Sequence, residues 1–284
     1  MKRLPDYLKR GIINTDATKS VRTVLRDKCL NTVCESARCP NKNECYTKNT
    51  ATFLIMGTTC TRNCRFCNIS AGKPQALDLE EPFKIAKAVD ELGLKYVVVT
   101  SVTRDDLDDQ GASHFANVIR EVRKISSGVR IEVLTPDFQG DENCINTVLD
   151  AFPDVFNHNI ETVPSMYKKA RPQASYERSL RVLEYAKMYS QKTLTKTGLM
   201  VGLGETKEEL ISVFKDLKRI NCDIVTIGQY IQPSKQHLEV EKFYEPSEYE
   251  ELTAAAKEIG IKHTFFSPLT RSSYKALEVF ENEK

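Results

Sequence analysis

The sequence predicts an α/β fold in the form of an incomplete (β/α)6 barrel, like a TIM barrel with part of its wall missing. Apolar runs alternate with amphipathic stretches along most of the chain, short connections join them, and polar residues follow the apolar runs. Alternating strands and helices of this kind build a parallel sheet from βα units. The 284 residues suffice for one large domain, since barrels of about 200 to 250 residues often form a single unit.

The apolar runs are the predicted strands, and the amphipathic stretches between them are the predicted helices. In the first of these helices Pro82 stands at the start and Gly93 follows the end, which is the usual asymmetry of helix caps. A further helix and a strand-like run are predicted at residues 246–259 and 261–266. The predicted strands cover residues 52–57, 95–101, 129–134, 155–161, 195–201 and 223–230, and the predicted helices cover residues 81–92, 111–125, 176–189 and 207–220.

The composition argues against several classes of protein. The formal net charge is +2 and charges of both signs are interspersed, so nothing favours nucleic acid as a partner. No run reaches the roughly 20 apolar residues of a membrane span, and no apolar stretch follows Met1-Lys2-Arg3-Leu4-Pro5 as in a secretory signal. We therefore predict a cytoplasmic protein with no membrane partner. An organelle reached after removal of a transit peptide is the alternative.

Cys60, Cys64 and Cys67 follow the predicted strand 52–57 closely. Their spacings of four and three suit an iron–sulfur cluster, because short cysteine loops can wrap one cubane. The fourth iron would then have no protein ligand, and an open metal position is a catalytic feature. The alternative is half of a zinc knuckle, although no second pair of thiols with zinc-finger spacing occurs in the sequence.

Cys34, Cys39 and Cys45 form a second group of thiols, in a segment too polar and interrupted to be expected in the core. The chain before it, residues 1–28, is predicted to form an extended arm and one short helix, with a loosely ordered terminus as the alternative. Nine cysteines in tight clusters fit metal ligation in a reducing compartment better than disulfides. We expect a zinc site or a cluster here. Its fourth ligand would come from cysteines in or beside apolar stretches, where a buried structural thiol is more common: Cys29, Cys144 or Cys222.

Polar residues gather where the predicted strands end, which is where a (β/α) barrel places its functional groups. In the fourth predicted strand, alternation puts Asn157, Asn159 and Glu161 on one face, with His158 and Ile160 on the other. A buried polar group without a partner costs about 1 to 3 kcal/mol, so these residues predict a bound nucleoside. A water-filled barrel mouth is the alternative. The other strand-end candidates are Ser101 with residues 103–106, and residues 135–138 and 202–205.

The cysteine spacing Cys60-x3-Cys64-x2-Cys67, with Phe66 before the last cysteine, resembles the signature of the radical S-adenosylmethionine (SAM) enzymes. In that superfamily the amino and carboxylate groups of SAM chelate the open iron of a 4Fe–4S cluster. An electron from the cluster then cleaves SAM to a 5′-deoxyadenosyl radical. The resemblance implies that these cysteines hold such a cluster and that SAM contacts Phe66, Ser101, Asn159 and Glu161.

Further motifs resemble the lipoyl synthase family within this superfamily, over roughly residues 30–274. One departure is Asp109-Gln110-Gly111, where the family usually has Asp-Gly-Gly, so the turn there is in doubt. The motifs are residues 34–45, 60–68, 100–106, 157–162, 196–205 and 228–230, and Arg271-Ser272-Ser273-Tyr274.

The resemblance implies that Cys34, Cys39 and Cys45 hold an auxiliary 4Fe–4S cluster whose fourth ligand is a serine. We assign Ser273 rather than Ser272 to this role, without a physical reason that separates them. One compact unit is expected, with three parts. They are an N-terminal extension with the auxiliary cysteines at 1–50, a radical SAM partial barrel at 51–232, and a C-terminal extension with the serine motif at 233–284.

The implied activity is that of a sulfurtransferase of lipoate biosynthesis, with no catalytic side chain beyond the cluster ligands. The radical would remove hydrogen at C6 and then C8 of an octanoyl chain on a carrier lysine, and the auxiliary cluster would supply the sulfur. The implied partners are octanoylated carrier domains, such as dehydrogenase E2 subunits and the glycine cleavage H protein, and a reductant such as ferredoxin or flavodoxin. Biotin-type sulfur insertion is one alternative, but it leaves the Cys34 group without a role. A zinc- or cluster-binding interaction module is the other.

Overall fold

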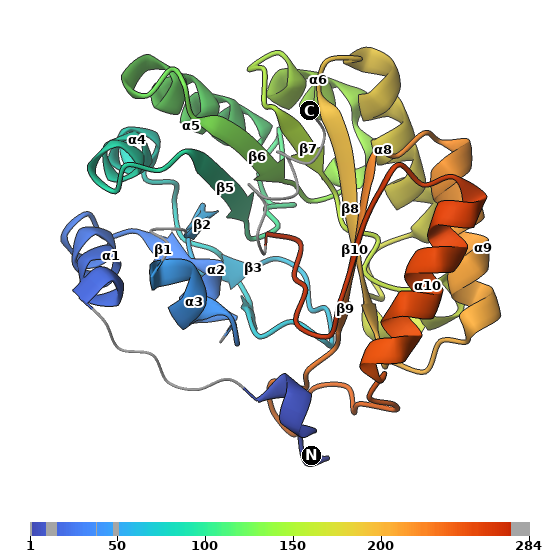
Figure 1. Ribbon diagram of the computed structural model, residues 1–284. Coiled ribbons are helices and arrows are strands. Elements are labelled where there is room, and N and C mark those ends of the chain that lie inside the picture. Colours follow the sequence, from blue (N-terminus) through green and yellow to red (C-terminus); the bar gives the residue numbers. More distant parts are fainter. Residues whose placement is uncertain (1, 10–15, 38, 48–50, 274–284) are drawn as a thin grey trace.

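The computed structural model describes residues 2–9, 16–37, 39–47 and 51–273, and its centre is an eight-stranded curved sheet (Figure 1). The strand order is β1-β2-β5-β6-β7-β8-β9-β10. β1 runs antiparallel to β2, and every other neighbouring pair is parallel. The strands are β1 (Asn31–Thr32), β2 (Thr52–Ile55), β5 (Tyr96–Ser101), β6 (Arg130–Leu134), β7 (Val155–Asn157), β8 (Leu194–Val201), β9 (Ile224–Gln229) and β10 (His263–Phe266), with β3 (Thr59–Cys60) and β4 (Ser70–Ala71) in a separate pair.

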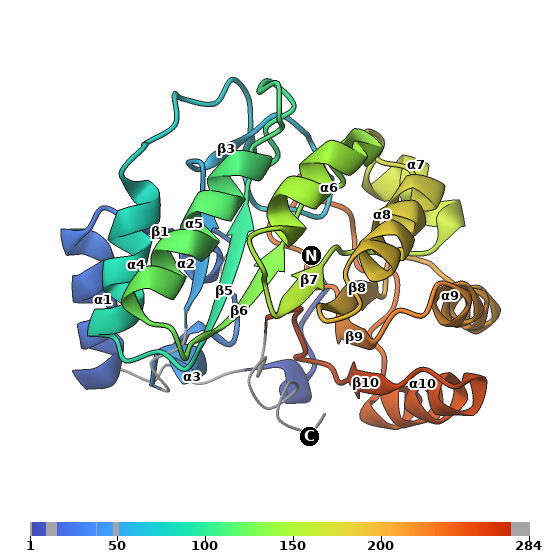
Figure 2. The same ribbon diagram turned by 90° about the horizontal axis from the view of Figure 1, so that it is seen from above.

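The larger helices follow one another around the outer side of the sheet (Figure 2). None of the helices in the described residues is long and apolar enough to cross a membrane. The α-helices are α1 (Asp16–Asp27), α2 (Val33–Ser36), α3 (Lys42–Thr47), α4 (Glu81–Glu91), α5 (Ala112–Ile125), α6 (Glu142–Leu149), α7 (Tyr167–Ala170), α8 (Tyr176–Tyr189), α9 (Lys207–Arg219) and α10 (Pro246–Ile259), and the 3-10 helices are η1 (Asp6–Leu8), η2 (Phe138–Gly140) and η3 (Pro164–Met166).

The apolar core lies between the helices and the sheet. Val97 and Val99 of β5 share one core cluster with Phe115 of α5. In the other half of the sheet, Leu199 of β8 shares a second cluster with Phe214 of α9. Successive side chains of a strand point to opposite faces, so residues between these apolar positions face the inner side of the sheet, where the polar groups described below collect.

Local sequence explains where the helices begin and end. Thr206 and Glu209 form a capping box at the start of α9, in which each side chain accepts a hydrogen bond from the other residue's backbone amide. Pro246 opens α10, and Gly260 ends it with a φ of 93°, a left-handed conformation that glycine adopts without steric cost. These signals keep both helices in the register that buries their apolar sides.

The predicted strands and helices are all present, with ends that differ by a few residues. The largest difference is at residues 155–161, where β7 ends at Asn157 and Glu161 has a φ of 65°. The predicted strand-like run 261–266 becomes β10, so the parallel part of the sheet has one more strand than predicted. Helix α6 is not among the predicted helices.

The N-terminal part is more ordered than predicted. The short helix predicted here is present as the 12-residue α1, which buries Val21, Val24 and Leu25. The prediction that the Cys34 segment stays out of the core is wrong, because Cys34 is 5% exposed and belongs to the first core cluster. The segment is anchored by β1, the edge strand of the sheet, which pairs with β2.

The turn at Gln110 places a non-glycine residue in a left-handed conformation. Gln110 has a φ of 52° and Gly111 a φ of 86°. The left-handed conformation costs a non-glycine residue about 1 to 2 kcal/mol. The Gln110 side chain is buried, and its Nε2 donates to the carbonyl of Phe138 at 3.0 Å, whereas its Oε1 is buried without a hydrogen bond.

Candidate metal centres

Cys60, Cys64 and Cys67 lie together in the loop that follows β2. Their thiols are close enough for their charges to interact. Burial raises the pKa of Cys67 to about 12, and it also raises the pKa of Cys64. Thiolate ligands at such positions need a bound cation, because metal binding is what deprotonates them.

Backbone amides point at the sulfur of Cys60. The N–H groups of Thr103 and Arg62 donate to Cys60 Sγ at 3.3 and 3.4 Å. Hydrogen bonds to sulfur are among the features by which proteins tune iron–sulfur clusters. Within the described residues, no three His, Cys, Asp or Glu side chains converge as the ligands of a single metal ion would.

Asn159, Glu161 and Arg171 form a polar group beside this loop. Asn159 Nδ2 donates to Glu161 Oε1 at 3.1 Å, and Arg171 donates to the carbonyl of Asn159 at 2.9 Å. The charges of Arg171 and Glu161 act on the pKa of Cys64 in opposite directions, lowering and raising it respectively. Burial raises the pKa of Glu161, and Arg171 opposes that shift.

Some polar atoms of this group have no partner. Arg171 Nε and Ser101 Oγ are both buried without a hydrogen bond. Arg171, directly after α7, is a residue that the sequence analysis missed, because no strand end or motif marks it. Phe66 is partly buried against the second core cluster. An anionic ligand with hydroxyl groups would satisfy these free donors.

Asn157 does not join this group, contrary to the prediction. Its Nδ2 donates to Glu132 Oε1 at 2.9 Å, inside the sheet. The strand ends at Asn157 and Glu161 is left-handed, but the residues beyond it keep their predicted sides. His158 and Ile160 pack on the helix side as predicted: His158 contacts Ser179 of α8, and Ile160 lies in the second core cluster.

The second group of thiols lies at the start of the sheet. The Cys39 amide donates to the carbonyl of Cys34 at 3.1 Å, and Cys45 lies on α3. Burial, followed by the charge of Cys39, raises the pKa of Cys34 to about 11. Asn68, next to Cys67, donates to the carbonyl of Ser36 at 2.8 Å, so the two cysteine segments are in contact.

The segment 267–273 lies between the two groups of thiols. Asn41 Nδ2 donates to the carbonyl of Leu269 at 2.7 Å, and Arg271 is close enough to Cys39 for their charges to interact. On the other side, Ser272 Oγ donates to Asn159 Oδ1 at 2.9 Å. Ser273 is half-buried, and Tyr274 lies outside the described residues.

Two glycines make room for this segment inside the sheet. A Cβ atom on Gly198 would lie 2.6 Å from Ser272 Oγ, and one on Gly228 would lie 1.9 Å from the carbonyl oxygen of Thr270. At Gly228 the contact is with the backbone of the segment, so no other residue type fits there without moving it, whereas at Gly198 side-chain oxygens would have to shift. The glycines of the 196–205 and 228–230 motifs therefore allow the close approach of another part of the chain.

The remaining cysteines are not part of either group. Cys144 and Cys222 are buried, and their thiols contact the carbonyls of Asp109 and Thr195. Cys29 is exposed, so its interpretation as a buried thiol is wrong. None of these contacts involves the Cys34 group.

Comparison with known proteins agrees with this architecture. The family model described as Radical SAM superfamily matches residues 54–217, more than half of the chain. The chain therefore belongs to the radical SAM superfamily. Two solved structures share the fold at low sequence identity. Methylornithine synthase (PylB) has a TM-score of 0.56 and 17% identity, covering 96% of this chain and 90% of its own. The hydrogenase maturase HydG has a TM-score of 0.60 and 16% identity, covering 95% of this chain and 60% of its own.

Closer relatives narrow the assignment. A lipoyl synthase of Caldicellulosiruptor saccharolyticus is 54% identical over 96% of both chains, and one of Caldanaerobacter subterraneus is 53% identical over the same shares. A lipoyl synthase of Rubrobacter xylanophilus is 49% identical over 99% of this chain and 87% of its own. The chain is an enzyme of the lipoyl synthase family.

Proposed function

We propose that this enzyme inserts sulfur at C6 and C8 of an octanoyl chain bound to a carrier lysine, with an auxiliary cluster as the sulfur source. Family membership supports lipoate biosynthesis by sulfur insertion and sets the interaction-module hypothesis aside. The observation that carries the finer proposal is the position of segment 267–273, which contacts the Cys34 group through Asn41 and the polar group through Asn159.

In this proposal Cys60, Cys64 and Cys67 hold the radical SAM cluster. The bound cluster supplies the electron that cleaves SAM. The residues of this chain bind and orient the co-substrate. The free donor on Arg171 suits a carboxylate, while Ser101 with Asn159 and Glu161 can meet amino and hydroxyl groups. Phe66 would provide the apolar side of the site.

Cys34, Cys39 and Cys45 would hold the auxiliary cluster, with Ser273 as the fourth ligand. The contacts of Ser272 support Ser273 rather than Ser272 as this ligand. The hydroxyl of Ser272 already donates to Asn159, which lies beside the loop that carries Cys60, Cys64 and Cys67. A serine oxygen is a weaker ligand for iron than a thiolate, which suits a cluster that is dismantled during turnover.

The inner side of the sheet would hold the octanoyl arm. We keep the division into an N-terminal extension (1–50), a partial barrel (51–232) and a C-terminal extension (233–284), with the extensions closing the incomplete barrel around the arm. Acid–base groups cannot activate an inert C–H bond, so the protein contributes by holding the carbon chain between the two centres. Octanoylated carrier domains and a small electron-transfer protein are the proposed partners, in a reducing compartment that keeps the nine thiols free.

The test is anaerobic turnover of an octanoylated carrier peptide, followed by mass analysis. The reconstituted enzyme should bind about eight irons in two clusters and form lipoyl peptide. Ser273→Ala should lose the auxiliary cluster and sulfur insertion but still cleave SAM, whereas Ser272→Ala should keep both clusters. If both serines can be replaced together without loss of sulfur insertion, the ligand assignment is wrong. Turnover of dethiobiotin but not of octanoyl peptide would instead support biotin-type chemistry.

A further inference from the structure

The three residues between Cys60 and Cys64 are each tied to a different part of the barrel wall. Thr61 N–H donates to the carbonyl of Thr103 at 3.1 Å, after β5. Arg62 reaches the carboxylates that follow β5 and β6. The Asn63 amide donates to Gln173 Oε1 at 2.7 Å, in the segment before α8. The ligand loop is therefore anchored at every residue between its first two cysteines.

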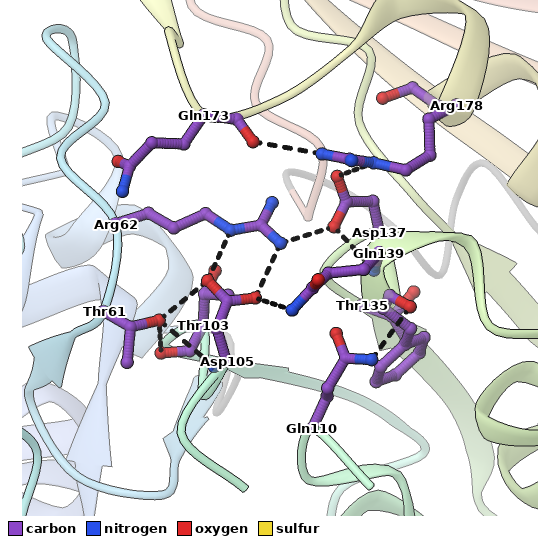
Figure 3. Close-up of polar contacts among 12 residues, drawn as sticks. Thr61, Arg62, Thr103, Asp105, Gln110, Thr135, Asp137, Gln139, Gln173 and Arg178 are labelled. Carbon is purple, nitrogen blue, oxygen red and sulfur yellow. Dashed lines mark hydrogen bonds and ion pairs between the residues drawn. The ribbon is translucent and has the colours of Figure 1, made fainter. Parts of the chain in front are cut away.

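Arg62 is the centre of this anchoring (Figure 3). Its Nε and one terminal nitrogen donate to both oxygens of Asp105, at 2.8 and 2.7 Å. The same terminal nitrogen lies 2.7 Å from Asp137 Oδ1. The Arg62 side chain is 6% exposed and that of Asp137 is 0% exposed. A planar guanidinium can form such a fork, and an ammonium group cannot.

The positive and negative charges around Arg62 are equal in number. Arg178 of α8 donates to Asp137 Oδ2 at 2.8 Å, so two arginines alternate with two aspartates. Asp105 also contacts the Thr61 hydroxyl at 3.0 Å. Buried ion pairs add little net stability compared with apolar residues of the same size. Stability alone is therefore a weak reason for placing one inside a metal-binding loop.

We propose, on the basis of the function proposed above, that Arg62 is a positioning residue for the radical SAM cluster. By fixing the loop to Asp105 and Asp137, it sets the direction in which the cluster presents its open iron toward Asn159 and Glu161. It acts through the loop, since its own N–H is one of the two amides that donate to Cys60 Sγ. This gives a role to the strand-end motifs 103–106 and 135–138, which ligand binding leaves unexplained.

The test compares Arg62→Lys with a matched control, Arg123→Lys. Asp154 is bridged by Arg123 and Arg130, at 2.5 and 2.7 Å, as Asp137 is bridged by Arg62 and Arg178. Asp154 directly precedes β7, at the opposite end of the strands from the loop. Both variants keep the positive charge and lose the planar guanidinium, which makes a fork on Asp105 in one case and a single contact with Asp154 in the other.

Both variants should load two clusters and unfold at similar temperatures. Arg62→Lys should raise KM for SAM and weaken the change that SAM causes in the electron paramagnetic resonance (EPR) spectrum of the reduced cluster. It should also lower turnover by about 10- to 100-fold, with more 5′-deoxyadenosine formed per lipoyl product. Arg123→Lys should leave all these readouts unchanged. Thr61→Val, which removes only a hydroxyl, should shift them in the same direction by a smaller factor.

The proposal would be overturned if Arg62→Lys shows the same SAM-dependent EPR change and the same KM for SAM as the wild-type enzyme. If Arg62→Lys does not fold, the same equality in Thr61→Val overturns it. These readouts need no octanoyl substrate. An enzyme that cleaves SAM but makes no lipoyl product would refute the proposed function and leave the positioning role to be decided by the EPR comparison.

Discussion

Lys196 and Glu132 form a buried ion pair on the inner side of the sheet. Lys196 Nζ lies 2.9 Å from Glu132 Oε2, and the two side chains are 1% and 0% exposed. Tyr96 Oη and Asn157 Nδ2 also donate to this carboxylate, at 2.7 and 2.9 Å. The sequence analysis expects Asn157 to need a polar partner, which is correct, but the partner is another part of the chain and not a ligand.

Lys196→Met should destabilise the protein by about 3 to 5 kcal/mol, because it leaves the buried Glu132 without a compensating charge. Urea unfolding measures the change. The control is Lys207→Met, which breaks an exposed pair with Glu251, with both side chains at least half exposed. Exposed pairs contribute about 0 to 1 kcal/mol. Equal losses in the two variants would show that Glu132 finds another partner or takes up a proton.

At the scale of elements, the C-terminal segment 267–273 depends on two strands that carry glycine on their inner side. Gly228→Ala should displace this segment, since the new Cβ would lie 1.9 Å from the backbone carbonyl oxygen of Thr270. We expect faster hydrogen exchange in 267–273 and loss of lipoyl formation, with SAM cleavage affected less. Exchange mass spectrometry and turnover assays provide the measurements.

Gly128→Ala is the matched control for this prediction. Gly128 has nothing within 4 Å of the position where its Cβ would stand, so it tests the entropic effect of the substitution without a clash. It should leave exchange in 267–273 unchanged. Unchanged exchange in Gly228→Ala as well would mean that the segment does not lie against β9 in solution.

Sequence patterns predicted the elements better than their edges. The runs that became β5, β6, β8 and β9 are apolar on the helix side and bounded by polar residues, so their positions were predictable. The end of β7 was not predictable from the sequence, because the left-handed conformation of Glu161 depends on tertiary contacts. The Glu161 amide donates to the carbonyl of Gly198 on β8. The local propensities of residues 155–161 do not predict such a long-range contact.

At the scale of the whole molecule, short motifs predicted which residues belong to the two candidate centres but not what surrounds them. Cysteine spacing predicts the candidate ligands, because chelation is a local property of the chain. Arg171 and the bridge from Asn41 to Leu269 join segments far apart in sequence, which no spacing reveals. The anchoring of the loop that carries Cys60, Cys64 and Cys67 also joins distant segments, since Arg62, Asp105 and Asp137 follow three different strands.

Acid stability of the whole fold should depend on His158, which joins the end of β7 to α8. Its ring nitrogens lie 2.9 Å from the Thr135 carbonyl and 3.1 Å from Ser179 Oγ. Burial, followed by the charge of Arg171, lowers the pKa of His158 to about 4. The carbonyl can only accept, so the neutral ring donates from Nδ1 and accepts the Ser179 hydroxyl at Nε2.

Between about pH 6.5 and about pH 4 the unfolded chain binds a proton at His158 that the folded chain does not. The free energy of unfolding should therefore fall as the pH falls, by about 2 kcal/mol between pH 7 and pH 5 from this residue. His158→Gln, which can donate to the carbonyl and accept the hydroxyl, should show a pH slope smaller by that amount in urea unfolding. Burial also lowers the pKa of His263, but this contribution is common to both proteins and cancels in the comparison. Equal slopes would show that His158 takes up its proton in the folded protein as readily as in the unfolded chain.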